Sequence, residues 1–267
     1  MNRLLSTEIV YQLFALLLSF IIVHGVYVAL VRPQADKVLA QQTAQMQADP
    51  DYVPEQSLYV VLKDYEQETT FVLFFWAVAI LGYKGRSVLR QQRHLETDLI
   101  GHGADIITPS EAPAIISHID QSLGDQERDF ILPRALTMAL ERFIATRRVP
   151  DASAAAIQTL ESEAERMESE LSIIRYIAWA IPSIGFIGTV RGIGQALGQA
   201  HRAVEGDISG VTQSLGTAFN STFVALVLSI ILMFVIHQLQ RAQERLVLDA
   251  GNYCESSLTR FLRSDIA

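Results

Sequence analysis

Side chains with hydroxyl and amide groups lie inside two of the most apolar stretches of the sequence. Thr189 belongs to PSIGFIGTVRGIGQALG, whereas LGTAFNSTFVAL contains Thr217, Asn220, Ser221 and Thr222. One hydroxyl in a membrane helix can bond to the carbonyl four residues earlier, so a single example carries little information. Several polar groups at one depth of a bilayer are more typical of a path for water or ions. We therefore interpret these five residues as candidate lining of an ion path.

The depth of two of these hydroxyls favours the same interpretation. If Gly198 and Gln213 mark one edge of the membrane, Thr189 and Thr222 each lie nine residues inside it. At 1.5 Å per helical residue, both side chains are then about 14 Å deep, near the middle of a bilayer. Two antiparallel helices would bring them to one level.

Small residues accompany the hydroxyls at steps of four. Lipid provides no hydrophobic effect that would drive helices together, so small side chains stabilise membrane helix pairs by letting the backbones approach. Pro182, in the same stretch as Thr189, is expected to kink its helix because it lacks an N–H group. The candidate packing residues are Gly185, Gly188, Gly192, Gly194, Ala218 and Ala225.

Carboxylates are absent from the four apolar stretches 9–31, 69–83, 172–197 and 215–239. Ion-coupled membrane proteins commonly place an ionisable carboxylate where the ion is handled. We therefore expect a partner helix to supply this group. Two explanations are open for Arg191, which lies beside the hydroxyls. It either reaches the outer headgroups, or faces the interior and pairs with an acid of the partner.

Composition and motifs indicate no enzyme chemistry. The net charge of −8 gives no sign of a nucleic-acid partner, and Cys254 is the only cysteine, which excludes a disulfide framework. GIGQALG, residues 192–198, resembles a dinucleotide-binding glycine run, but no strand is expected before it. The six histidines show no metal-ligand spacing. We predict a protein that is not an enzyme, uses no cofactor and binds no metal.

Long apolar runs must position these residues, because half of the 267 residues are hydrophobic and they are concentrated in runs. The pattern predicts an all-α, polytopic membrane protein with four transmembrane helices, the last two extending into the cytoplasm as long helices. Basic residues crowd after the second and fourth runs, which predicts that both termini are cytoplasmic. The predicted segments are 1–31 (N-terminal segment and first transmembrane helix), 32–68 (outer, periplasmic loop), 69–83 (second transmembrane helix), 84–150 (cytoplasmic helical insert), 151–198 (long helix including the third span), 199–213 (outer loop) and 214–267 (fourth transmembrane helix and cytoplasmic helical tail).

Two motifs give the chain a resemblance to a known family. GFIGTVRGI, residues 185–193, resembles the Gly-x-x-Gly-Thr-Val-x-Gly signature of the MotA/TolQ/ExbB proton-channel family. LGTAFNSTFVAL, residues 215–226, resembles the second signature of that family. The resemblance covers roughly residues 150–260.

The resemblance implies an ion-conducting subunit of a motor complex in the bacterial inner membrane, where the flow of protons or sodium ions does mechanical work. It further implies a pentamer around two copies of a small single-span partner, like MotB, TolR or ExbD, that carries an aspartate. Thr189 and Thr222 match the threonines of the two signatures. They would line the ion path beside the aspartate of the partner.

Two features of the sequence depart from the family pattern. The family often has an aromatic or aliphatic residue at the position of Arg191, and the loop 32–68 is longer than expected for a flagellar stator subunit. Four spans with a cytoplasmic N-terminus nevertheless resemble the stator layout more than the three-span layout of ExbB and TolQ. Two other functions stay open, namely a self-sufficient ion channel or transporter and a structural membrane scaffold whose small residues only pack.

Overall fold

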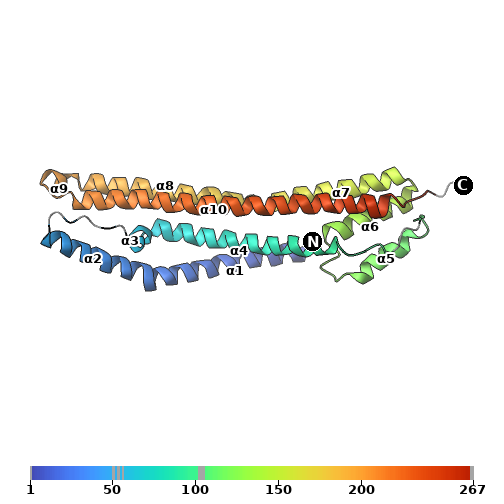
Figure 1. Cartoon of the computed structure of the whole chain (residues 1–267), viewed down its shortest axis with the longest axis horizontal. Coiled ribbons are helices and arrows are strands. Elements are labelled where there is room, and N and C mark those ends of the chain that lie inside the picture. Colours follow the sequence, from blue (N-terminus) through green and yellow to red (C-terminus); the bar gives the residue numbers. More distant parts are fainter. Residues whose placement is uncertain (1, 50–51, 53–54, 56, 102–105, 265–267) are drawn as a thin grey trace. The chain divides into compact units, whose positions relative to one another are not determined.

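Helices make up most of the structure (Figure 1). The computed structural model describes residues 2–49, 52, 55, 57–101 and 106–264. Within this part of the chain, the only β-type backbone pairing is an isolated bridge between Ile107 and Leu262. The predicted all-α class is therefore confirmed. Small parts of the predicted segments 1–31, 32–68, 84–150 and 214–267 lie outside the described residues. The helices are α1 (Asn2–Val26), η1 (Tyr27–Val31), α2 (Arg32–Ala48), α3 (Leu58–Leu62), α4 (Tyr65–His94), α5 (Ala112–Ser122), α6 (Ile131–Thr146), α7 (Val149–Glu170), α8 (Ser172–Gly198), α9 (Ala200–Val204), α10 (Ser209–Tyr253) and η2 (Cys254–Thr259).

Four helical stretches are long and apolar enough to cross a membrane. They are Glu8–Ala48, Tyr65–His94, Val149–Gly198 and Ser209–Thr259. Each contains one of the four apolar runs of the sequence, so the prediction of four membrane-length helices is confirmed by length and composition. Each is also longer than the roughly 20 residues that span a hydrocarbon core, so each is long enough to extend beyond the bilayer.

The chain forms two compact units. Unit 1 consists of Met1–Leu81 and Ile173–Ile236, and unit 2 consists of Gly82–Ser172 and His237–Ala267. Helices α4 and α10 contribute residues to both units. All candidate residues of the ion path and of helix packing belong to unit 1.

In unit 1, helix α1 lies beside the first part of α4 (Figure 1). The indole Nε1 of Trp76 donates a hydrogen bond of 2.9 Å to the backbone carbonyl of Gln12. The hydroxyl of Tyr11 donates one of 3.1 Å to the backbone carbonyl of Ala79. Both bonds let polar atoms of aromatic side chains find a partner between apolar helices, as buried Trp and Tyr require. A buried apolar cluster packs the same helices together and consists of Val23, Tyr27, Val31 and Val72.

The first helix continues beyond Val31, where the sequence predicts that the first span ends. Helix α1 passes through the π-helical turn η1 into α2, so residues 32–48 of the predicted outer loop are helical. The π turn lies directly before Pro33, and the N–H of Arg32 donates to the carbonyl of Tyr27. Because proline has no N–H and its ring crowds the preceding turn, a wider turn at this place lets the helix continue.

Helix α4 is longer than the predicted second span 69–83. Its 30 residues extend over about 45 Å at 1.5 Å per residue, so the helix is long enough to cross a bilayer of ordinary thickness. The apolar pattern stops at Glu66 and Glu68, yet these two acids form the first turn of the helix. Carboxylates are stabilised there by the partial positive charge of a helix N-terminus and, in this chain, by cationic partners described below.

Unit 2 is a small helical assembly built on α6 and α7. Helix α6 packs against α7 through one apolar face, and η2 packs against both. Pro133 lies in the first turns of α6, where a missing N–H costs little. A turn at Leu171 separates α7 from α8, whereas the sequence predicts one continuous helix from 151 to 198. At this turn the N–H of Leu171 donates to the carbonyls of Glu168 and Ser169 and not to the carbonyl four residues earlier, as in a regular α-helix. The largest fully buried side chains of α6 are Leu132, Leu136, Leu140 and Phe143.

Cys254 is buried in η2, beyond Leu239, the predicted end of the fourth span. Burial raises the pKa of its thiol to about 12. Because the thiolate is the reactive form, we expect maleimide to label the folded protein at about pH 8 at least about a hundredfold more slowly than the denatured chain. Mass spectrometry of timed samples measures the two rates. Equal rates would show that Cys254 is open to solvent in the folded state.

Candidate functional site

Helices α8 and α10 approach backbone to backbone along a face of small residues. On α8 this face consists of Gly185, Gly188 and Gly192. A Cβ atom added to any of the three would lie 2.5 to 2.7 Å from a side-chain carbon of α10, closer than side chains ever pack. Only glycine therefore permits this approach, as in other membrane helix pairs. The facing residues of α10 are, in the same order, Ala225, Ser221 and Ala218.

Gly194 does not take part in this contact, which differs from the expectation drawn from the sequence. Nothing lies within 4 Å of a Cβ atom added to it. It follows Gly192 by two residues, a rotation of about 200° around the helix, so the two glycines lie on opposite sides of α8. Gly198 follows Gly194 by four residues and lies on the same side of α8, and nothing lies within 4 Å of a Cβ atom added there either.

Thr189 and Thr222 meet at the centre of the contact between α8 and α10. Their Oγ1 atoms are 2.5 Å apart, so the two antiparallel helices do bring these hydroxyls to one level. Both side chains are half-buried in the chain, which leaves one side of the pair open to another molecule. The hydroxyls reach each other because the helices approach closely at Gly185 and Gly188, where a larger side chain would separate them.

The threonine pair has more acceptors than protons. Thr189 Oγ1 lies 3.0 Å from the carbonyl oxygen of Ala218, and Thr222 Oγ1 lies 3.0 Å from that of Gly185. Each hydroxyl has one proton. Two protons cannot serve both carbonyls and also the contact between the hydroxyls. Four oxygen atoms thus converge where a further proton or a small cation would be stabilised, since hard cations prefer oxygen ligands.

The other polar candidates on α10 do not join this pair. The hydroxyl of Ser221 is buried and donates to the carbonyl of Thr217 over 2.8 Å, within its own helix. Thr217 and Asn220 are half-buried on the same helix. Ser221 faces Gly188, so it lines the helix contact, whereas Thr217 and Asn220 remain candidates for a path that another subunit completes.

Pro182 lies inside α8 and removes one hydrogen bond of the helix. The carbonyl that loses its donor is that of Ala178, four residues earlier. The hydroxyl of Ser229 on α10 donates to this carbonyl over 3.1 Å. A side chain of the neighbouring helix therefore replaces the missing bond, which is how membrane proteins tolerate proline in a span.

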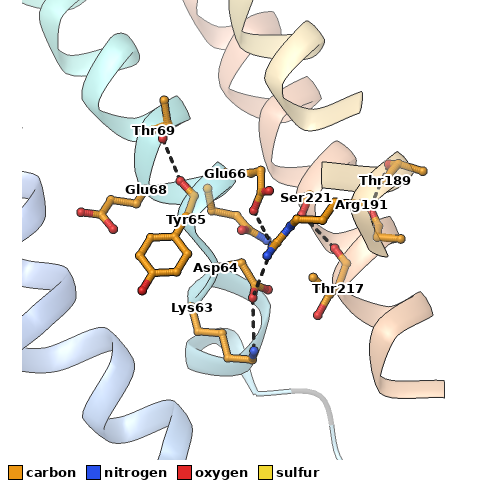
Figure 2. Close-up of polar contacts among 12 residues, drawn as sticks. Lys63, Asp64, Tyr65, Glu66, Glu68, Thr69, Thr189, Arg191, Thr217 and Ser221 are labelled. Atoms are coloured by element: carbon orange, nitrogen blue, oxygen red, sulfur yellow. Dashed lines mark hydrogen bonds and ion pairs between the residues drawn. The ribbon is translucent and has the colours of Figure 1, made fainter. Parts of the chain in front are cut away.

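Arg191 pairs with acids of its own chain, which neither explanation from the sequence anticipates. Its Nη2 atom lies 2.6 Å from Oε2 of Glu66 and 3.9 Å from Oδ1 of Asp64 (Figure 2). The side chains of Glu66 and Asp64 are only 12% and 14% exposed. Both acids precede the apolar run 69–83, which itself contains no carboxylate, and they come near Arg191 because α4 begins before that run.

Glu68 forms a second ion cluster in unit 1. Its carboxylate is 8% exposed, lies 2.6 Å from Nδ1 of His24 and accepts a hydrogen bond from the guanidinium of Arg32. Arg32 also lies over the ring of Tyr65, 4.4 Å from its centroid. These contacts connect the first helix with α4 and provide the partners that a buried carboxylate requires.

The sequence contained one signal for these acids. DYEQET, residues 64–69, places three carboxylates directly before an apolar run, and helix N-termini favour acids in their first turn. Extending the second helix backwards over these residues would have brought the acids to its end. Their pairing with Arg191 and Arg32 still required the tertiary structure.

Within the described ranges, no group of three or more His, Cys, Asp or Glu side chains is arranged to hold a metal ion. The chemistry of the site is therefore that of hydroxyl and carbonyl oxygens between helices. Hydroxyls relay protons or coordinate cations, but their own acidity is too weak to bind and release a proton at neutral pH. A carboxylate has to take that part of the task.

The fold and the site together define a multi-pass membrane protein with a polar contact between closely packed membrane helices. Residues 127–251 match the model of the MotA/TolQ/ExbB proton channel family, which shows family membership for this part of the chain. The matched region includes the glycine face, Thr189 and Thr222. No curated protein and no solved structure matches the chain.

Family membership agrees with the expectations drawn from the two motifs. Members are channel subunits and not enzymes, and they belong to a bacterial inner-membrane family. The family also implies a complex with a partner of the MotB, TolR or ExbD type.

Proposed function

We propose that this chain conducts protons or sodium ions along α8 and α10 and, with a small single-span partner that carries an aspartate, converts the ion-motive force into mechanical work across the cell envelope. The chain assembles as a pentamer around two copies of that partner. Thr189 on α8 and Thr222 on α10 line the path, with Thr217 and Asn220 further along α10. Both termini and residues 84–171 lie in the cytoplasm.

The observation that carries this proposal is the threonine pair. Four oxygen atoms meet between two membrane-length helices, with only two hydroxyl protons to share among them. Interhelical hydrogen bonds also stabilise a scaffold, but packing alone does not require four oxygen atoms that share two protons. The pair is also half-exposed, so a carboxylate on a partner helix can approach it.

Apolar side chains support contact with lipid or with other subunits. Large side chains are exposed along the outer faces of α8 and α10, on the sides away from the glycine contact. In water such an apolar surface would cause the protein to aggregate, whereas in a membrane it contacts lipid tails or neighbouring helices. Examples are Phe186, Ile187, Val190, Phe219, Phe223 and Ile230.

Glu66 gives one specific argument for the alternative of a self-sufficient channel. It supplies a carboxylate within this chain, beside Gly188 and Ser221. However, the carboxylate is already paired with the guanidinium of Arg191 at 2.6 Å. We therefore keep the aspartate of a partner as the group that takes up the ion.

Gentle affinity purification of the chain from native membranes tests the proposal. We expect a small single-span protein with a membrane aspartate to co-purify, in fewer copies than the chain itself. Native mass spectrometry gives the ratio, for which five to two is expected. A complex that contains only this chain would contradict the shared path and favour a lone channel or a scaffold, which ion-flux measurements on the purified protein then separate.

A further inference from the structure

Four charged side chains form a connected network at one end of the threonine site (Figure 2). Arg191 on α8 contacts Glu66 at 2.6 Å and Asp64 at 3.9 Å. Lys63 contacts the same oxygen of Asp64 at 3.2 Å. Two positive and two negative charges are thus balanced around the start of α4.

This network lies against the helix contact that holds the threonine pair. A Cβ atom added to Gly188 would lie 3.2 Å from Cγ of Glu66 and 2.6 Å from Cβ of Ser221. Gly188 immediately precedes Thr189, and Arg191 follows two residues later. Arg191 therefore lies on the side of the hydroxyl site that is nearer the α8 C-terminus, which is the outer side in the proposed orientation, whereas Glu66 lies level with Gly188.

The network is not built as a simple structural clamp. Arg191 Nε and Asp64 Oδ2 are buried atoms that have no hydrogen-bond partner among the described residues. A pair that only joined two helices would be expected to satisfy its buried polar atoms. The side chain of Arg191 is also 36% exposed, so part of its charge faces the space beside the helices.

We infer that Arg191, Glu66 and Asp64 form an electrostatic filter beside the threonine pair in the ion path, an inference that rests on the proposed function. The guanidinium repels an approaching cation, and the two carboxylates attract it. Fixed charges of this kind set the barrier for ion entry in other membrane pores. In this chain their balance determines how readily a proton or sodium ion reaches the threonine pair.

Opposite effects of two single substitutions test the filter. The variants R191Q and E66Q are purified with the natural partner and reconstituted in liposomes, where an imposed proton gradient drives influx that an internal dye records. A sodium gradient is measured in parallel. Removing one charge at this range should change entry about three- to tenfold. We expect R191Q to increase the influx, E66Q to decrease it, and the double variant R191Q/E66Q to return it near the wild-type rate.

A structural clamp predicts a different pattern, because both single substitutions break the same contact. Influx that changes in one direction for both variants, or does not change at all, would therefore overturn the filter. The matched controls R202Q and E205Q remove exposed charges within α9 and directly after it, and should leave the rate unchanged. The absence of any influx through the wild-type complex would instead reject the proposed function, and the filter with it.

Discussion

Ion flux through the reconstituted complex is expected to fall about ten- to a hundredfold when Thr189 or Thr222 is replaced by valine. Valine has nearly the shape of threonine, so the helix contact is retained and only the hydroxyl is lost. A hydrogen bond to a charged group contributes roughly 1.5–3 kcal/mol, which corresponds to this range of rates. The same proteoliposome assay with a proton or sodium gradient measures the effect.

Three further variants decide whether the hydroxyls themselves carry the effect. Thr222→Ser keeps a hydroxyl at the site and should retain most of the flux. Thr212→Val is the matched control, because the hydroxyl of Thr212 is exposed and bonds only to the carbonyl of Ile208 in its own helix. Thr217→Val shows whether the path extends along α10. Full flux in both Thr189→Val and Thr222→Val would mean that the pair only packs, as a scaffold requires.

The second large effect is expected from a single methyl group at Gly192. A Cβ atom there would lie 2.8 Å from the backbone oxygen of Ser214 and 2.9 Å from Cα of Ala218, and neither atom can move without shifting α10. We expect Gly192→Ala to destabilise unit 1 by at least about 2 kcal/mol, since overpacking of a close contact costs roughly 1–3 kcal/mol. The thermal unfolding midpoint in detergent, followed by tryptophan fluorescence, should drop by several degrees.

Two other glycines serve as comparisons for Gly192. Gly194→Ala adds the same methyl group to the opposite side of α8, where nothing lies within 4 Å, and should leave the midpoint unchanged. Gly188→Ala meets mainly the side chain of Ser221, so the double variant Gly188→Ala/Ser221→Gly should recover part of the loss. If Gly192→Ala and Gly194→Ala melt at the same temperature, the two helices do not approach as closely as described.

The unexpected pairing of Arg191 changes how the ion path is understood. The sequence places no carboxylate within its apolar runs, and this led to the expectation that a partner supplies the carboxylate that handles the ion. The structure shows that Glu66 and Asp64 reach the site from the first turn of α4 and the residue just before it. The two proposals above therefore assign uptake of the ion to an aspartate of the partner and control of its entry to acids of this chain.

Helix class and membrane character followed from the sequence alone, for a physical reason. In lipid every backbone N–H and C=O must be bonded within the chain, so an apolar run of sufficient length has to be helical. The depth of a residue then depends only on its distance along the helix from the membrane edge. This is why residue spacing alone assigned Thr189 and Thr222 to one level, and why the glycines at Gly185, Gly188 and Gly192 indicated a close contact.

The tertiary structure decided what depends on rotation and on contacts between helices distant in sequence. A step of four does not reveal which side of α8 faces another helix, so Gly192 packs while Gly194 does not. Contacts with distant helices also stabilise the start of a helix, since Arg191 and Arg32 pair with Glu66 and Glu68 in the first turn of α4. Spacing along a chain determines which residues share a face, but only packing determines what that face meets.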